Sequence, residues 1–312
     1  MNIYKNISNI PFDKNTVLTV GSFDGLHLGH KSILRRLKAI SESENLRNLL
    51  ITFDPHPQIF FQRKDRPALK LLTSIGEKKL ILEEFGIDNL LILNFDKKFA
   101  QTSAQDFIKK YLLEQIGMKK ILIGYDHSFG KNRGGDIQLL KEIGENENFK
   151  VEKIDAFGEN ERIFSSSEIR LALLGGDLKS ANSMLGRPYS ILGKVKEGEK
   201  RGRTIGYPTA NIYPLDENKL ILTHGVYAIS SFYNGKVLFG MANIGVRPTF
   251  ENDEKQVIEI NFFDFSENIY NEIFNISFHK FIREEIKFES AEHLISQIKS
   301  DEKECRRFYG IV

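Results

Sequence analysis

The first half of the chain alternates between short apolar runs and longer amphipathic segments. Five runs have the length of buried strands: 17–20, 48–53, 90–95, 120–124 and 151–154. Between them, segments 74–85 and 103–115 carry apolar residues at helical spacing, and each begins with a serine suited to cap a helix. This alternation predicts an α/β domain whose mainly parallel sheet is covered by helices on both faces.

Two short helices are expected to close this half. Ser165 and Glu168 form a capping-box pattern in front of an apolar stretch. Asp177 and Gly186 suit the start and the end of a second helix, and Pro188 follows. We therefore place a domain boundary between residues 1–186 and residues 187–312.

After this boundary, strand-like segments follow one another without helices between them. They are 191–196, 226–233, 236–244, 257–265 and 273–281, with a final helix from about residue 290. Consecutive strands joined by turn signals such as Asn234-Gly235 predict an antiparallel sheet or a small barrel. The chain of 312 residues is long enough for two cores, and we expect the second to fold independently.

Charge and cysteine content limit which partners and which cellular compartment the protein is expected to have. Lys plus Arg number 44 and Asp plus Glu 42, interspersed to a net charge of +2, so we expect no nucleic-acid partner. The single cysteine, Cys305, cannot form an internal disulfide, which suits a reducing compartment. The sequence shows neither a secretory signal nor an apolar run of membrane-spanning length, so we expect a cytoplasmic protein without a membrane partner. The oligomeric state is left open.

The most informative motif is segment 21–30, Gly-Ser-Phe-Asp-Gly-Leu-His-Leu-Gly-His, between the first strand and a predicted helix. Glycines allow close approach of a ligand, and a helix N-terminus favours an anion. His27 and His30 can donate hydrogen bonds to phosphate oxygens, so the motif predicts a nucleotide site. The chain lacks the P-loop pattern and the dinucleotide-binding glycine pattern, which disfavours a P-loop kinase and a dehydrogenase.

Other polar residues follow neighbouring predicted strands. His56 comes after the second strand and Asp126 after the fourth, as His27 and His30 come after the first. Ligands of parallel sheets bind outside the carboxyl ends of the strands, so these side chains are expected to converge on one site.

Several further motifs occur in a characteristic order and spacing. They are Phe-Asp-Pro-His-Pro at 53–57, the segments 124–130 and 165–170, Gly-Arg-Thr-Ile-Gly-Tyr-Pro-Thr-Ala-Asn at 202–211, the segments 225–227 and 243–250, and Glu259 ahead of Phe263-Asp264-Phe265. With them the chain resembles, over nearly its whole length, the bifunctional bacterial riboflavin kinase/FMN adenylyltransferase family. The resemblance implies a Rossmann-like nucleotidyltransferase domain followed by a six-stranded antiparallel kinase barrel with a terminal helix.

The resemblance also implies activities, cofactors and site residues. Riboflavin would be phosphorylated to FMN and FMN adenylylated to FAD, each with ATP and Mg²⁺. Nucleotide contacts would come from Gly21, Phe23, Asp24, Gly29, Ser166, Ser167, Arg170, Gly202 and Arg203, and flavin contacts from Phe53, His56, Asp126 and Arg247. Thr209 and Asn211 would hold the magnesium ion.

The two reactions make different chemical demands. A phosphate oxygen of FMN is already anionic, so adenylyl transfer needs charge stabilisation, which His27 and His30 can supply, rather than a strong base. A ribityl hydroxyl must lose a proton, and Glu259 is the candidate base. On the residues alone, Glu259 could equally be a paired structural carboxylate, and Arg170 a surface charge.

Departures from the family pattern are few. His127 stands where an aromatic is usual, Ser167 where Thr is usual, and Asn261 where His is usual. Two other protein classes share parts of this pattern. A class I aminoacyl-tRNA synthetase should carry a Lys-Met-Ser-Lys-Ser-like loop, which is not visible, and a non-catalytic flavin-binding protein should lack Glu259 or one of the histidines.

Overall fold

The computed structural model describes residues 1–62, 65, 67–125, 129–131, 134–159, 162–197, 206–248 and 254–311. The chain divides into two compact units. The first contains Met1–Leu69 and Lys78–Ser165, and the second contains Lys70–Glu77 and Ser166–Val312. The second unit therefore includes a short segment from the first half of the sequence, for which the hydrophobic pattern gives no sign.

The first unit is built on a six-stranded parallel sheet in the order β1-β4-β3-β2-β5-β6. The strands are β1 (Asn2–Tyr4), β2 (Thr16–Val20), β3 (Arg47–Asp54), β4 (Asn89–Asn94), β5 (Met118–Gly124) and β6 (Lys150–Ile154). The last five coincide with the predicted apolar runs, so the α/β class is confirmed. β1 has no predicted counterpart, because three largely exposed edge residues carry no periodic signal.

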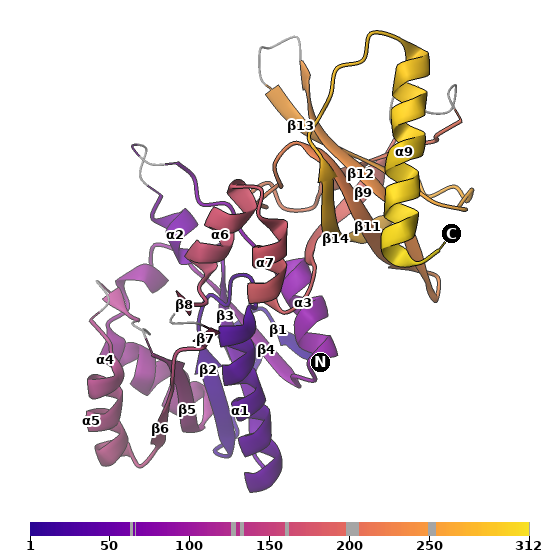
Figure 1. The fold of residues 1–312 in the computed structure, drawn as a ribbon. Helices are drawn as coiled ribbons and strands as arrows, with labels where there is room; N and C mark the ends of the chain where they lie inside the picture. The colour runs from indigo at the N-terminus through magenta and orange to yellow at the C-terminus, as the bar shows by residue number, and fades with distance from the viewer. Residues whose placement is uncertain are drawn as a thin grey trace. The chain divides into compact units, whose positions relative to one another are not determined.

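Helices cover both faces of this sheet (Figure 1). α1 (Leu28–Glu44) contacts β2, β3 and β5. Leu18 and Val20 of β2 belong to a core cluster that also includes residues of η3 (Phe107–Ile116) and α5 (Ile137–Glu147). Because strand side chains alternate, Val17 and Thr19 face the opposite side. β2 is thus buried on both faces, as its continuous apolar run indicates.

The predicted helix 103–115 is present in an unexpected form. Ser103 caps it by accepting a hydrogen bond from the Asp106 backbone at 3.0 Å. After α4 (Ala104–Asp106), the ten residues of η3 are π-helical. Apolar spacing over three turns does not distinguish this wider winding from an α-helix. The remaining short elements of this unit are η1 (Ile7–Asn9), α2 (Pro57–Phe60), η2 (Phe99–Gln101), β7 (Gly158–Glu159) and β8 (Arg162–Ile163), while α3 (Ile75–Glu84) runs across the division between the units.

The second unit contains a closed antiparallel barrel in the order β10-β13-β12-β11-β14-β9. Its strands are β9 (Tyr189–Lys196), β10 (Ala210–Pro214), β11 (Gly225–Tyr233), β12 (Lys236–Pro248), β13 (Glu254–Phe262) and β14 (Ile273–Arg283). The barrel expected from the resemblance is confirmed. Hydrophobic periodicity alone misses β10, because five residues that include Asn and Pro give too weak a pattern.

Alternation along the strands separates the barrel interior from its outer face. Ile212, Ile258 and Ile244 are register partners on three adjacent strands, and all are buried inside. On the outer face, α9 (Ala291–Tyr309) lies along the barrel, and its Cys305 packs in a cluster with Val226 (Figure 1). The predicted strand 257–265 is shifted, because β13 ends at Phe262.

Two short helices, α6 (Ser166–Leu174) and α7 (Leu178–Leu185), precede the barrel and belong to the same unit. Asp177 caps α7 through the Ser180 backbone N–H at 3.0 Å, and Gly186 ends it with a positive φ of 61°, as expected. α6 begins directly after Ser165, which agrees with the predicted cap position. No helix in the described ranges combines the length and the apolar character needed to cross a membrane.

Candidate active sites

The loop between β2 and α1 has a strained backbone. Phe23, Gly25 and Leu26 have positive φ values of 47°, 85° and 42°, a region that bulky residues rarely adopt. Such residues cost about 1–3 kcal/mol each and persist only where the surroundings enforce them. Phe23 and Leu26 are both buried, so packing holds the loop in this shape. Backbone strain of this kind is concentrated at functional sites.

This loop brings His27 and His30 together. Their rings stack with centroids 3.8 Å apart, and the Phe23 ring lies 5.0 Å from that of His30. His27 is the N-cap residue of α1, although its side chain makes no capping hydrogen bond. Gly29 permits the arrangement, because a Cβ there would lie 3.0 Å from the His27 ring. The predicted pair is therefore one compact unit at a helix N-terminus.

Burial keeps both imidazoles neutral near pH 7. It lowers the pKa of His27 to about 4, against an opposing effect of Asp24. The pKa of His30 is held well below its usual value by burial, and then by His27 and Lys78. Within the described residues, neither Nδ1 atom has a hydrogen-bond partner, although both are buried. Buried polar atoms are normally paired, so these two nitrogens are suited to a ligand.

A second set of contacts fixes the loop to neighbouring elements. The Ser22 carbonyl accepts hydrogen bonds from Lys78 Nζ at 2.7 Å and from Thr52 Oγ1 on β3 at 3.2 Å. The Gly21 N–H donates to the Ile51 carbonyl at 3.0 Å. Lys78, which the motif analysis does not include, thus places a buried positive charge beside the histidine loop. A helical lysine without a motif around it gave no signal in the sequence.

His56 follows β3, the strand adjacent to β2, as predicted. Its Nδ1 accepts a hydrogen bond from the Gln58 backbone at 3.1 Å, so the neutral ring carries its proton on Nε2. The preceding peptide bond, Asp54-Pro55, is cis. His56 therefore caps α2.

An aromatic cluster lies at the carboxyl ends of β3 and β4. Phe53 packs edge-on against Phe95 at 5.6 Å, and Phe95 also contacts Phe60 and Phe61 at 5.5 and 5.6 Å. Phe60 and Phe61 are 37% and 58% exposed, unusually open for such large apolar rings. The sequence analysis names only Phe53. The Phe pair three residues after the end of the 53–57 motif was the available signal.

Three of the remaining predicted residues, Asp126, Gly202 and Arg203, lie outside the described residues, as does His127. Arg247 belongs to β12, where its register partner is Lys255, but its side chain is not among those described.

The predicted phosphate-binding residues of α6 lie in the second unit. Ser166 and Ser167 form the first turn of α6, and Arg170 donates from Nε to the Lys70 carbonyl at 2.9 Å. Their participation in a site with His27 and His30 stays a prediction.

The barrel brings together a separate group of polar residues. Glu259 on β13 is the register partner of both Asn211 on β10 and Asn243 on β12. Directly opposite residues point to the same face, so these three side chains share the outer face. Asn211 is only 3% exposed, and its buried Oδ1 has no hydrogen-bond partner among the described residues. Thr209 lies half-buried just before β10.

Asn261, a departure from the family pattern, has a clear structural role. Its Nδ2 donates to the Pro208 carbonyl at 2.7 Å. This hydrogen bond holds the segment that leads into Thr209 and Asn211. The sequence analysis gives Asn261 no such role, because the contact joins residues far apart in the chain.

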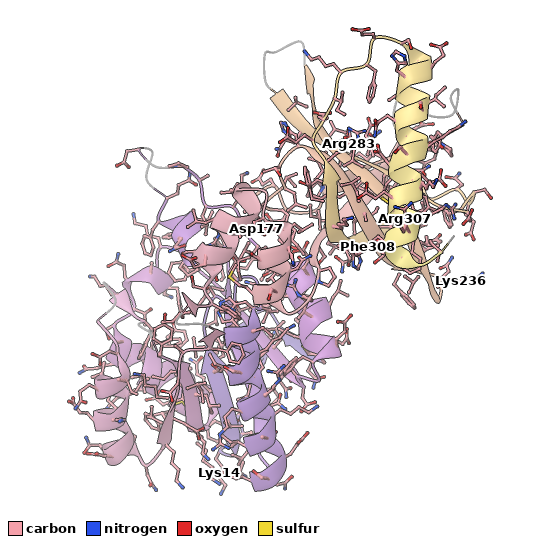
Figure 2. All side chains as sticks on the ribbon, in the orientation of Figure 1. Lys14, Asp177, Lys236, Arg283, Arg307 and Phe308 are labelled. Atoms are coloured by element: carbon pink, nitrogen blue, oxygen red, sulfur yellow. The ribbon has the colours of Figure 1, made fainter. Side chains whose placement is uncertain are left out.

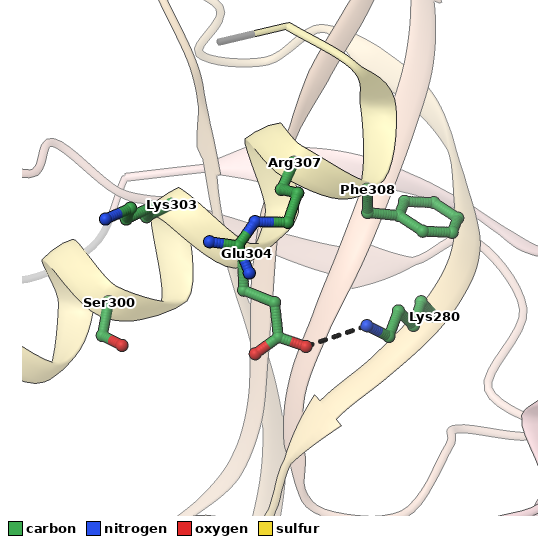
Figure 3. Close-up of a pocket in the computed structure, with 6 residues that line it drawn as sticks. All are labelled: Lys280, Ser300, Lys303, Glu304, Arg307 and Phe308. Atoms are coloured by element: carbon green, nitrogen blue, oxygen red, sulfur yellow. Dashed lines mark hydrogen bonds and ion pairs between the residues drawn. The ribbon is translucent and has the colours of Figure 1, made fainter.

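A cavity of about 590 Å³ lies elsewhere on the second unit, between β14 and α9 (Figure 3). Lys280 and Glu304 form an ion pair of 2.8 Å in its wall. The lining residues are Lys280, Ser300, Lys303, Glu304, Arg307 and Phe308, and none of them is a predicted site residue. Figure 2 shows Arg307 and Phe308 on α9.

The histidine loop of the first unit and the polar group around Glu259 in the second define a class of protein. It combines a nucleotidyltransferase-like α/β domain with a barrel that carries a carboxylate site. The family model of FAD synthetase matches residues 9–168, and that of riboflavin kinase matches residues 185–309. The chain belongs to the bifunctional riboflavin kinase/FMN adenylyltransferase family.

Relatives of this name include those of Buchnera aphidicola subsp. Schizaphis graminum (38% identical, 100% of both chains) and Listeria monocytogenes (37%, 96% of this chain and 94% of that one). The Escherichia coli relative is 37% identical over 98% of this chain and 96% of its own. A crystal structure described as a macrolide-efflux protein from Streptococcus pneumoniae superposes with a TM-score of 0.86 at 30% identity, covering 97% of this chain and 98% of that one.

Proposed function

We propose that this chain phosphorylates riboflavin to FMN and adenylylates FMN to FAD at two separate sites. The N-terminal part contains the FAD synthetase domain and the C-terminal part the riboflavin kinase domain. We propose a domain boundary after residue 186, directly past the end of α7 and at the start of the riboflavin kinase match. The observation that carries the two-site assignment is that both groups contain buried polar atoms without a hydrogen-bond partner among the described residues: Nδ1 of His27 and His30 in the first, and Oδ1 of Asn211 in the second.

In adenylyl transfer, a phosphate oxygen of FMN attacks the α-phosphorus of ATP, and pyrophosphate leaves with the electrons of the broken P–O bond. The nucleophile is already an anion, so the site's main task is to stabilise negative charge. Neutral His27 and His30 can each donate one hydrogen bond to phosphate oxygens, and Lys78 adds a positive charge nearby. The N-terminus of α1 adds a partial positive charge that favours an anion.

The nucleotide and flavin contacts of this site are proposed from the same geometry. Gly21 and Gly29 keep space beside Phe23 and the His27 ring. The half-exposed rings of Phe60 and Phe61 lie nearly perpendicular to each other and both contact Phe95, and this exposed aromatic surface is suited to packing against a flavin ring. Ser166, Ser167, Arg170, Asp24 and Asp126 are proposed contacts from the sequence motifs alone.

In the kinase reaction, Glu259 takes the proton of the terminal ribityl hydroxyl, whose oxygen attacks the γ-phosphorus of ATP while ADP leaves. General bases of this kind contribute about 10²–10⁴-fold. Glu259 is half-buried between Asn211 and Asn243, where it can face a bound alcohol. Gly202, Arg203 and Arg247 remain proposed contacts to nucleotide and flavin.

Thr209 and Asn211 fit a magnesium ion. Mg²⁺ prefers oxygen ligands and commonly shares them with water and phosphate. The buried Asn211 Oδ1 lacks a partner in the described structure, as an unfilled ligand position would. When bound, the ion would neutralise charge on the ATP phosphates, and the two side chains would hold it next to Glu259. A cytoplasmic location is also proposed, supported by the buried free thiol of Cys305.

The test is a time course with purified protein, riboflavin, ATP and Mg²⁺, with flavin products separated by chromatography. We expect FMN to form first and FAD to follow. Glu259→Gln should lower FMN formation at least a hundredfold while still converting supplied FMN to FAD. Loss of both steps in this variant, or of neither, would contradict the two-site assignment.

A further inference from the structure

The segment 207–209, which leads into β10, is held by side chains at two consecutive residues. The Pro208 carbonyl accepts a hydrogen bond from Asn261 Nδ2 on β13 at 2.7 Å. The Tyr207 hydroxyl donates to Glu302 Oε2 on α9 at 3.1 Å. Both hydrogen bonds are partly buried, and Asn261 itself is buried. Two separate elements of the second unit therefore fix this short segment.

The Glu302 carboxylate is itself restrained on α9. Arg306 Nε donates to Glu302 Oε1 at 2.8 Å, so the two carboxylate oxygens have different partners. The two Nη atoms of Arg306 donate to both carboxylate oxygens of Asp264, at 2.9 Å each, and the guanidinium lies 4.9 Å from the centre of the Phe263 ring. Bidentate pairs of this kind fix geometry as well as adding energy. Glu302 is thereby held in the orientation that meets the Tyr207 hydroxyl.

Thr209 and Asn211, the proposed magnesium ligands, differ in how they are fixed. Asn211 lies within β10, where strand pairing on both sides holds its backbone. Thr209 comes just before Ala210, the first residue of β10, so its position depends on the segment that precedes it. Mg²⁺ demands near-ideal octahedral geometry at short metal–oxygen distances. A small displacement of Thr209 would therefore weaken the binding of an ion shared with Asn211.

We propose that Glu302 and Asn261 are positioning residues of the kinase site, which hold the segment 207–209 in the shape that the magnesium ion requires. Neither belongs to the proposed ligand set. Loss of either hydrogen bond frees part of the segment, and Thr209 then shifts relative to Asn211. The C-terminal helix α9 thus takes part in the kinase site through one carboxylate. The inference rests on the proposed magnesium ligands.

The test measures the magnesium dependence of riboflavin phosphorylation by full-length variants. Tyr207→Phe removes only the hydroxyl, and Asn261→Asp replaces the donating NH₂ group with an oxygen of similar size. Each should raise the half-saturating magnesium concentration by about tenfold, the lower end of the roughly 10–100-fold cost of losing such support. At saturating magnesium, kcat should return to within about twofold of wild type, because the reacting groups are unchanged.

Variants of Glu302 show whether α9 acts through the Tyr207 hydroxyl. Glu302→Ala should match Tyr207→Phe, and the two combined should be no worse than either alone. Glu302→Gln keeps an oxygen that can accept the same hydrogen bond, so it should be milder than Glu302→Ala. Glu304→Ala is the matched control, because it removes an ion pair of α9, with Lys280 at 2.8 Å, that does not involve the segment 207–209. It should keep the wild-type magnesium dependence.

Binding of Mn²⁺ in the presence of ADP, followed by electron paramagnetic resonance, gives a readout without turnover. The part of this binding that Asn211→Ala removes belongs to the kinase site, and Tyr207→Phe and Asn261→Asp should weaken it by about tenfold. The inference is overturned if either variant keeps the wild-type metal dependence, if excess magnesium does not restore the rate, or if the losses in Glu302→Ala and Tyr207→Phe multiply. Unchanged metal binding in Asn211→Ala would instead overturn the underlying magnesium assignment.

Discussion

Glu77 and Lys219 form a fully buried ion pair within the second unit. Glu77 Oε2 and Lys219 Nζ lie 2.7 Å apart, and each side chain is only 1% exposed. Both charged groups make further hydrogen bonds. Lys219 donates to the Leu72 carbonyl at 2.6 Å, and Glu77 accepts from the backbone N–H groups of Ser74 and Leu192. The pair therefore ties the segment 70–77 to the barrel.

Removing one partner should leave an uncompensated buried charge. We expect Glu77→Ala to destabilise the second unit by about 3–5 kcal/mol, whereas Glu77→Leu combined with Lys219→Met should be far milder. Urea unfolding of the full chain, followed through kinase activity, measures both. Exposed Glu83→Ala on the same helix is the control. Equal destabilisation by the single and double variants would refute this account.

The same pair bears on the expected independence of the kinase domain. A fragment starting near residue 187 lacks Glu77 and leaves Lys219 buried without its carboxylate. We expect such a fragment to be less stable than the barrel in the full chain, and Lys219→Met to recover part of the loss. Thermal unfolding of the two fragments tests this. A fragment that Lys219→Met further destabilises would show that Lys219 has found another partner.

The sequence predicted those features that depend on local pattern. Five parallel strands, the histidine loop at a helix N-terminus and the caps Ser103 and Asp177 follow from periodicity and residue type. Contacts between distant residues could not be predicted in this way. The Glu77–Lys219 pair and the Asn261–Pro208 hydrogen bond join residues 142 and 53 positions apart, and no spacing rule predicts such contacts.

His27 should make the stability of the first unit depend on pH. Its pKa is about 4 in the folded chain and 6.5 ordinarily, so between these values only the unfolded state takes up the proton. Stability is therefore complete above pH 6.5 and falls as the pH is lowered toward 4, by about 2 kcal/mol at pH 5 from this group. His27→Gln should lose correspondingly less between pH 7.5 and pH 5 in urea unfolding. The exposed His293→Gln serves as control, and an unchanged pH dependence in His27→Gln would contradict the prediction.

His30→Ala should impair adenylyl transfer selectively. Loss of one oriented donor to developing phosphate charge typically costs roughly a hundredfold in rate. FAD formation from supplied FMN should fall by this order, while FMN formation from riboflavin persists. Because burial keeps the His30 ring neutral, the wild-type rate should show no step from its titration between pH 6.5 and 8. A normal FAD yield in His30→Ala would rule out the proposed role.

Asn211→Ala should raise the magnesium requirement of the kinase reaction. The variant removes the buried Oδ1, and loss of a ligand or of its support weakens metal affinity by roughly 10–100-fold. Asn211→Asp keeps an oxygen at the same place. At every magnesium concentration this variant should therefore bind the ion at least as well as Asn211→Ala. Initial rates of FMN formation across a magnesium titration measure the shift, with exposed Asn146→Ala as control. Conversion of supplied FMN to FAD should keep its wild-type magnesium dependence, because Asn211 belongs to the barrel. An equal shift in both reactions would mean that the substitution disturbs the whole chain rather than one metal position.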